Sequence, residues 1–176
     1  PNQFAGIVTE TPTNPLIQSM DLERIRELAT KHGVCLILDP TINSPANVDI
    51  SPYADIIVNS LTKYASSEGD VIMGAVCTTQ QCPERDAITQ RIRAIVEPPY
   101  ARNLQRLAEQ IDRYLPLIES INTSTIQVVE YLKSHPKVTK VYWSKEARSK
   151  ANYERIARTP ESIGGMISFV LNTDLA

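Results

Sequence analysis

Short, largely apolar runs that stop abruptly at polar side chains constrain the fold of this chain more than any other feature of its sequence. They are Phe4–Thr9 (FAGIVT), Val34–Leu38 (VCLIL), Ala54–Val58 (ADIIV) and Val71–Cys77 (VIMGAVC). Runs of this length and composition are typical of β-strands that are covered on both faces, as in the parallel sheets of α/β proteins. The order strand, helix, strand, loop, strand, strand therefore predicts an α/β fold with a mainly parallel sheet.

Two histidines stand where helices are expected to end. From Ser19 onwards, apolar residues at helical spacing predict a helix that ends at Lys31, His32 and Gly33. Cations favour the negative C-terminal end of a helix, and glycine suits the left-handed residue that follows it. We therefore interpret His32 as a capping residue, and we interpret His135, which precedes a proline at another expected helix exit, in the same way.

The sequence after Pro83 changes to a mainly helical pattern. We expect one helix that ends at Glu97-Pro98-Pro99, a second that is interrupted near Pro116, and a third over Ile118–Leu132. Four arginines are the densest basic group of these segments, and we expect them to form a solvated face: Arg91, Arg93, Arg102 and Arg106.

Strand-like runs return over Val138–Trp143 and Met166–Leu171, with a polar helical stretch between them. We therefore expect residues 1–117 to form the C-terminal part of a large domain with linker helices, and residues 118–176 to begin a small C-terminal α/β domain. Strand-like sequence stands close to both ends of the chain, so we also expect a fragment of a larger enzyme.

Composition and charge narrow the class of protein. Hydrophobic residues make up 42% of the 176 residues and charged residues 22%, which is typical of a soluble globular protein, and the net charge of −2 does not favour nucleic acid or a membrane as a partner. Cys35, Cys77 and Cys82 form no CxxC pair and no zinc spacing. We expect Cys35 and Cys77 to be core residues of a cytoplasmic protein, and we expect no metal site.

Polar side chains follow three of the expected strands. Asn14 follows the first, Asp39 the second, and Ser60, Thr62 and Lys63 the third. Because the carboxyl ends of parallel strands meet at one edge of a sheet, and ligands of open α/β sheets bind there, these groups are candidates for one binding site.

Two cofactor classes have chemistry that could match this set of groups. The run LILD resembles the acidic strand of a P-loop nucleotide-binding protein, but the chain has neither GxxxxGK[ST] nor GxGxxG. Pyridoxal phosphate accounts for the whole set, because its aldehyde needs an amine, its ring nitrogen needs a carboxylate that keeps it protonated, and its phosphate needs short donors. Lys63, Asp39 and the hydroxyls of Ser60 and Thr62 meet these needs, and Asn14 can donate to the phenolic oxygen.

Several motifs at these positions resemble the Cys/Met-metabolism family of pyridoxal-phosphate enzymes. They are ETPTNP (10–15), LDPT (38–41) and NSLTKY (59–64) followed by GDVIMGAV (69–76), and GGMISFVL (164–171) resembles the first strand of the family's C-terminal domain. The resemblance implies a three-layer α/β/α fold of the aspartate-aminotransferase type (fold type I), pyridoxal 5′-phosphate as cofactor, an amino-acid substrate, and a homo-oligomer built as a dimer of dimers.

Carried over residue by residue, the resemblance makes Lys63 the Schiff-base lysine and the general base. Asp39 is then the partner of the pyridine nitrogen, and Asn14 holds O3′ of the ring. The remaining cofactor contacts fall to three hydroxyls, with Ser60 and Thr62 on the phosphate and Thr41 against the ring or its aspartate.

Two departures from the family pattern bear on substrate specificity. Pro40 stands where the family usually has Asn, and Ser67-Glu68-Gly69-Asp70 stands where it usually has Gly-His-Ser-Asp. The expected function is pyridoxal-phosphate-dependent transsulfuration, first of all γ-replacement on an O-acyl-homoserine as in cystathionine γ-synthases. Cystathionine or methionine γ-lyase, cystathionine β-lyase and O-acyl-homoserine sulfhydrylase activities are alternatives, and so is a non-catalytic relative that acts as an assembly module. We expect the isolated fragment to be inactive.

Overall fold

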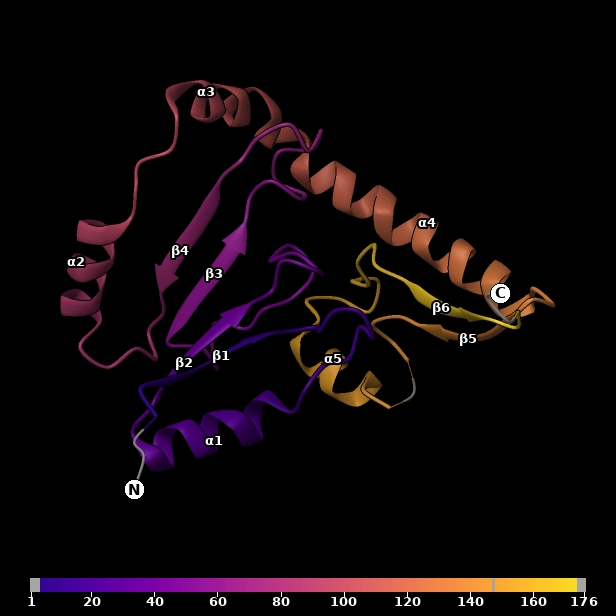
Figure 1. The fold of residues 1–176 in the computed structure, drawn as a ribbon, viewed down its shortest axis with the longest axis horizontal. Coiled ribbons are helices and arrows are strands. Elements are labelled where there is room, and N and C mark those ends of the chain that lie inside the picture. The colour runs from indigo at the N-terminus through magenta and orange to yellow at the C-terminus, as the bar shows by residue number, and fades with distance from the viewer. Residues whose placement is uncertain (1–3, 147, 174–176) are drawn as a thin grey trace.

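Four strands form a sheet in chain order, and three of them are parallel. The computed structural model, which describes residues 4–146 and 148–173, contains β1 (Gly6–Glu10), β2 (Cys35–Asp39), β3 (Ile56–Ser60) and β4 (Gly74–Thr78) (Figure 1). β1, β2 and β3 run parallel, whereas β4 pairs antiparallel with β3 from Ser60–Gly74 to Ile56–Thr78. The predicted α/β fold with a mainly parallel sheet is therefore confirmed.

The third and fourth strands begin later than the sequence predicted. The expected strand Ala54–Val58 is Ile56–Ser60, and the expected strand Val71–Cys77 begins only at Gly74. Residues 61–73 form the connecting loop instead, because the backbone of Met73 bonds back to Leu61 and Thr62 before the β3–β4 ladder starts. Polar residues up to Ser60 therefore belong to the strand itself.

Helix α1 (Leu22–His32) connects β1 to β2 and begins and ends where its capping residues stand. The Asp21 carboxylate accepts a hydrogen bond from Arg24 N at 3.1 Å, which satisfies one of the free N–H groups of the first turn. Gly33 ends the helix with a φ of 62°, a conformation that glycine adopts without steric cost. The predicted exit at His32 is confirmed.

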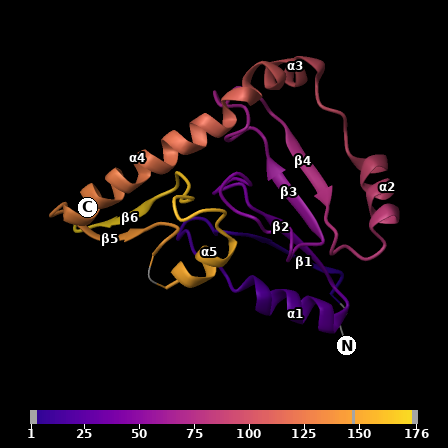
Figure 2. The ribbon, with the colours of Figure 1, turned by 180° about the vertical axis from the view of Figure 1, so that it is seen from behind.

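The core lies between α1, β2 and a helix from the far end of the chain. Leu36 and Leu38 alternate with half-buried residues along β2 and are fully buried against Leu22 and Ala29 of α1. Tyr153, from α5 (Lys150–Ile156), is buried in the same cluster. Chain segments more than a hundred residues apart therefore build one core, as the position of α5 beside β1 and β2 in Figures 1 and 2 also shows.

The segment after β4 consists of three helices, as predicted. It comprises α2 (Arg85–Ile95), α3 (Ala101–Gln110), the 3₁₀ turn η1 (Ile111–Arg113) and α4 (Tyr114–Ser134). The break expected near Pro116 lies slightly earlier, at η1, because that proline stands in the first turn of α4, where its missing N–H has no helical partner to lose. His135 is the C-cap residue of α4, as predicted, and its backbone N–H donates to Leu132 O at 3.2 Å.

The C-terminal part contains a two-stranded antiparallel sheet of β5 (Val138–Tyr142) and β6 (Ser168–Leu171). Helix α4 runs through residue 117 without a break, and α5 is tied to the first sheet's loops by Asp49 N to Ile156 O and Arg158 N to Asn47 O. The division into residues 1–117 and 118–176 stays a prediction.

Two expectations about single side chains are wrong. Cys77 is exposed on β4, because this strand lies at the open edge of the sheet, while Cys35 is half-buried and Cys82 is buried. Arg106 does not lie on a simple solvated face, because three carboxylates bind its guanidinium.

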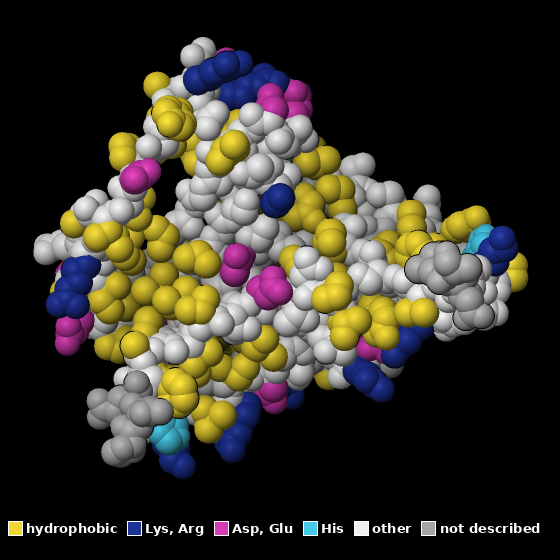
Figure 3. Space-filling view, in the orientation of Figure 1, with side chains coloured by type: hydrophobic (Ala, Val, Ile, Leu, Met, Phe, Trp, Pro, Cys, Tyr) yellow, Lys and Arg dark blue, Asp and Glu magenta, His cyan; other side chains and the backbone are white. Residues whose placement is uncertain are grey.

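Within the described residues, no helix is long and apolar enough to cross a membrane. Hydrophobic side chains gather over the sheet between α1 and α2 (Figure 3).

Candidate active site

The carboxyl ends of β1, β2 and β3 lie side by side, and most of the predicted site residues stand at this edge. Glu10 and Asp39, the last residues of β1 and β2, are register partners, and Thr11 N donates to Asp39 O at 3.0 Å. Ser60 is the last residue of β3 and pairs with Gly74 of the antiparallel strand β4. The loop that carries Lys63 therefore leaves the sheet at the same edge.

Thr41 connects the carboxylate of Asp39 with the end of β3. Its backbone N–H donates to Asp39 Oδ1 at 2.8 Å, and its hydroxyl oxygen accepts from Ser60 N at 2.9 Å. The same hydroxyl reaches Asn59 Oδ1 at 3.5 Å. Thr41 therefore fixes both the orientation of the Asp39 carboxylate and the position of Ser60. It lies beside Asp39, one of the two neighbours that the resemblance implied for it.

The turn after Ser60 is held by its own backbone and by two neighbouring side chains. Ser66 Oγ donates to Thr62 O at 2.9 Å, and Ser66 N donates to Leu61 O at 3.0 Å. Tyr64 reaches back to the loop after β2, where its hydroxyl donates to Ile42 O at 3.0 Å. Partial burial raises the pKa of the Tyr64 phenol, so it stays protonated as a donor at neutral pH. These contacts fix the backbone on either side of Lys63.

Lys63 itself is exposed, and none of the ion pairs found within residues 4–146 and 148–173 includes it. Asn14 is also exposed, and among the described residues its one hydrogen bond is from its backbone N–H to Glu10 Oε1 at 3.0 Å. No hydrogen bond of the described residues joins Lys63 or Asn14 to Asp39. Their convergence on one cofactor stays a prediction.

The hydroxyl of Thr62 is already engaged. It accepts from Met73 N at 3.2 Å and contacts Met73 O at 3.4 Å, so it fastens the end of the loop to its beginning. The Ser60 hydroxyl makes no side-chain hydrogen bond within the described part of the chain. Of the two predicted phosphate contacts, only Ser60 therefore has a hydroxyl without a hydrogen bond among the described residues.

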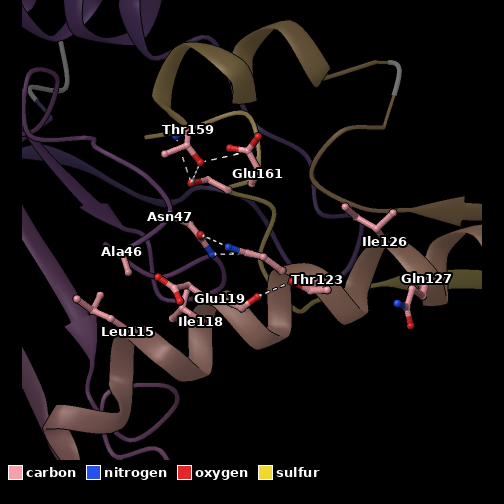
Figure 4. A pocket seen from close by; sticks show the side chains of 12 residues that line it. Ala46, Asn47, Leu115, Ile118, Glu119, Thr123, Ile126, Gln127, Thr159 and Glu161 are labelled. Atoms are coloured by element: carbon pink, nitrogen blue, oxygen red, sulfur yellow. Dashed lines mark hydrogen bonds between the residues drawn. The ribbon is translucent and has the colours of Figure 1, made fainter.

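A pocket of about 610 Å³ lies elsewhere, between α4 and the loops around Asn47 and Thr159 (Figure 4). Its floor is a reciprocal amide pair, in which Asn122 Nδ2 donates to Asn47 Oδ1 at 2.8 Å and Asn47 Nδ2 donates to Asn122 Oδ1 at 3.2 Å. Asn122 Oδ1 also accepts from the backbone N–H of Gly164. These bonds tie α4 to the two loops, so we interpret this amide pair as structural.

The chain has the fold of the fold type I class of pyridoxal-phosphate enzymes, with a mainly parallel sheet. A carboxylate and a hydroxyl stand at the carboxyl edge of this sheet, and the loop with the amine leaves from it. Within this class the chain belongs to the family described as Cys/Met metabolism PLP-dependent enzymes, whose model matches residues 2–176.

Three relatives illustrate this membership. The chain is 35% identical over 175 residues to an L-2-amino-4-chloropent-4-enoate dechlorinase/desaturase of Streptantibioticus cattleyicolor (99% of this chain, 35% of that protein). It is 32% identical to a cystathionine gamma-synthase of Neurospora crassa (96% and 27%). The crystal structure of cystathionine gamma-lyase from Lactobacillus plantarum, complexed with L-serine, matches with a TM-score of 0.81 at 28% identity (94% and 43%). The chain thus spans about a third of the first curated relative, about a quarter of the second and less than half of the solved structure.

The residues at the edge fit pyridoxal phosphate. Asp39 is half-buried with Oδ1 bound by Thr41, and no hydrogen bond to its Oδ2 occurs among the described residues, so one oxygen can accept from a pyridinium. Ser60 offers a hydroxyl and Lys63 an exposed amine. The sequence does not predict the contacts of Ser66 and Tyr64, because their only sequence signal is a short polar run after a strand.

Proposed function

We propose that this chain is part of a pyridoxal-phosphate-dependent enzyme that acts on amino acids with a leaving group on the γ-carbon, with cystathionine γ-synthase activity as the leading candidate. The observation that carries the proposal is the alignment of Asp39 and Ser60 at the carboxyl edge of the sheet, with the Lys63 turn leaving from the same edge. The 32% identity to a cystathionine gamma-synthase supports the particular activity.

The proposal gives each predicted site residue a role. Asp39 would hold the proton on the ring nitrogen, because a carboxylate beside a cation favours the charged form. Lys63 would bind the aldehyde through Nζ and, once released by substrate, remove the proton from the substrate Cα. Ser60 would donate to the phosphate, with Thr62 as a further phosphate contact and Asn14 as a donor to O3′. The cofactor supplies an electron sink for the carbanion formed at Cα.

A related activity has independent support. The relative at 35% identity is named for removing chlorine from carbon 4 of an amino acid, which is also the γ position. Elimination of a γ-substituent is therefore the second candidate, and γ-lyase, β-lyase or sulfhydrylase activity and a non-catalytic assembly role remain alternatives. A homo-oligomer and a cytoplasmic location also belong to the proposal; the three free thiols are compatible with a reducing compartment.

The first experiment tests cofactor attachment. Protein incubated with pyridoxal phosphate is reduced with borohydride, digested and mapped by mass spectrometry. We expect a phosphopyridoxyl group on Lys63 and its loss in Lys63→Ala. Lys31→Ala, which removes an exposed amine at the end of α1, is the matched control and should stay loaded. Labelling that is equal on Lys63 and on Lys31 would refute the assignment.

The second experiment tests the reaction. The protein with the full length of its relatives is assayed with an O-acyl-homoserine and cysteine, with cystathionine, and with an amino acid that carries chlorine on carbon 4. Cystathionine formation from the first pair supports the leading candidate. Preferred release of chloride or of cysteine supports elimination, and no turnover with any substrate by cofactor-loaded protein supports the non-catalytic alternative.

A further inference from the structure

Helix α3 is joined to the loop after Lys63 by a network of charged side chains. The Arg106 guanidinium donates from Nη2 to Glu68 Oε2 at 2.6 Å and from Nε to Asp70 Oδ2 at 2.8 Å. Arg113 from η1 binds the other oxygen of Glu68 at 2.7 Å. Figure 1 shows the β3–β4 loop reaching α3, and Figure 3 shows acidic and basic side chains side by side at that end of the molecule.

A buried side chain strengthens the connection. Gln110, the last residue of α3, is fully buried, and its Nε2 donates to Asp70 Oδ1 at 2.7 Å. Asn103 from the same helix donates to Ile72 O at 3.0 Å. Four side chains of α3 and η1 are therefore directed at a single short stretch of the loop.

The connection continues from this stretch to the backbone that carries Lys63. Gly69 N donates to Ser66 Oγ at 3.2 Å, and the same hydroxyl donates to Thr62 O, the carbonyl directly before Lys63. Ser66 N donates to Leu61 O. A displacement of the acidic loop would therefore break the contacts that fix the lysine turn.

The geometry explains why an arginine serves here. A single exposed ion pair stabilises little, but a network with good geometry stabilises more, and the planar guanidinium binds two carboxylates through different nitrogens. Arg106 is about one-third exposed (35%), and Glu68 is shared with a second arginine. A lysine would offer a point charge without this fork.

We propose that Arg106 is a positioning residue for Lys63: it fixes the Glu68–Asp70 loop, which in turn orders the turn that bears the amine. The proposal rests on the proposed function only for what Lys63 does with its amine. Glu68 stands at one of the positions where the chain departs from the family motif, so its pairing with Arg106 and Arg113 is a feature of this sequence.

Hydrogen–deuterium exchange of the cofactor-free protein tests whether Arg106 fixes the Glu68–Asp70 loop. In Arg106→Gln we expect the amides of Ser66 and Gly69 to exchange about tenfold faster, because two networked ion pairs to the loop are lost. Arg106→Lys should give an intermediate rate. Glu109→Gln is the matched control, because Glu109 binds Arg106 at 3.3 Å from within α3 and leaves the loop contacts intact. Parent-like exchange in Arg106→Gln, or equal acceleration in the control, overturns the proposal.

The affinity for the cofactor tests whether this loop orders the turn that bears Lys63. Arg106→Gln should bind pyridoxal phosphate about tenfold more weakly than the parent, with an unchanged far-ultraviolet circular dichroism spectrum. Glu68→Gln, which alters only the loop side of the ion pair, should also speed amide exchange and weaken cofactor binding, as Arg106→Gln does. A loosened loop with parent affinity refutes the positioning role. Absence of cofactor uptake by the unaltered protein refutes the proposed function instead, while the exchange rates still decide whether Arg106 orders the turn.

Discussion

Removal of the buried carboxylate of Asp55 should destabilise this protein more than removal of any exposed charge on α1. The Asp55 side chain is 1% exposed and lies just before β3. Its Oδ1 accepts from Arg26 at 2.8 Å and its Oδ2 accepts from the backbone N–H of Leu36 at 2.7 Å. One carboxylate thus joins α1, β2 and the start of β3.

The size of the effect follows from which partners are lost. Asp55→Ala leaves the buried Leu36 N–H without an acceptor, which costs about 1–3 kcal/mol. It also removes the partner of Arg26, whose side chain is 20% exposed and is partly hydrated, so this loss lies below the ~3–5 kcal/mol of a fully buried pair. We expect about 3 kcal/mol in total for Asp55→Ala. Asp55→Asn keeps an oxygen for Leu36 and should lose about half of that.

Urea unfolding followed by circular dichroism measures these free energies. The slope with denaturant should stay the same in all variants, because the substitutions change stability and not the surface exposed on unfolding. The control is Glu27→Gln, which removes the pair of Arg24 and Glu27, both side chains 66% exposed, and should change the free energy of unfolding by less than about 0.5 kcal/mol. An Asp55→Ala variant within that range, or one no less stable than Asp55→Asn, would refute the reasoning.

Two further predictions concern a glycine and a surface carboxylate. Gly164→Ala should destabilise the protein by about 2 kcal/mol or more in the same assay, because Gly164 has a φ of 83° and an added Cβ would lie 2.6 Å from Oδ1 of the buried Asn43. The hydrogen bond from Gln110, followed by that from Arg106, holds the pKa of Asp70 below its usual value. Its contribution to stability is therefore complete above about pH 4 and is lost as the pH falls through the lowered pKa, so the difference in melting temperature between the parent and Asp70→Asn should be constant from pH 5 to 7 and shrink below about pH 4. A difference that grows on acidification would contradict this assignment.

The sheet was predictable because its strands carry their own signal. A run such as Val34–Leu38 has no polar face, so it fits only a strand covered on both sides, and Gly33 marks the helix end before it. The break at η1 was not predictable from Pro116, because a proline at a helix start and one that ends a helix look alike in sequence.

The site was predictable to the extent that chain order determines it. Asp39 and Ser60 follow apolar runs, so the topology of a parallel sheet brings them to one edge. The links that run from Thr41 to Ser60 and from Arg106 to Glu68 connect residues far apart in the sequence, and no local pattern indicates them. The exposure of Cys77 was missed for a related reason, since an edge strand and a central strand share the same composition.

The burial of Tyr153 in the cluster that holds Leu36 and Leu38 has a consequence for how the protein is synthesised. Until residue 153 has been synthesised, the apolar side chains around Leu36 and Leu38 lack the ring that covers them and stay in contact with water. A chaperone can bind such an apolar surface on the nascent chain. The Tyr153 hydroxyl oxygen then accepts a hydrogen bond from Asn43 Nδ2, which stands 110 residues earlier in the chain. A polypeptide that ends within α4 would lack Tyr153, so the apolar side chains around Leu36 and Leu38 would stay exposed to proteases.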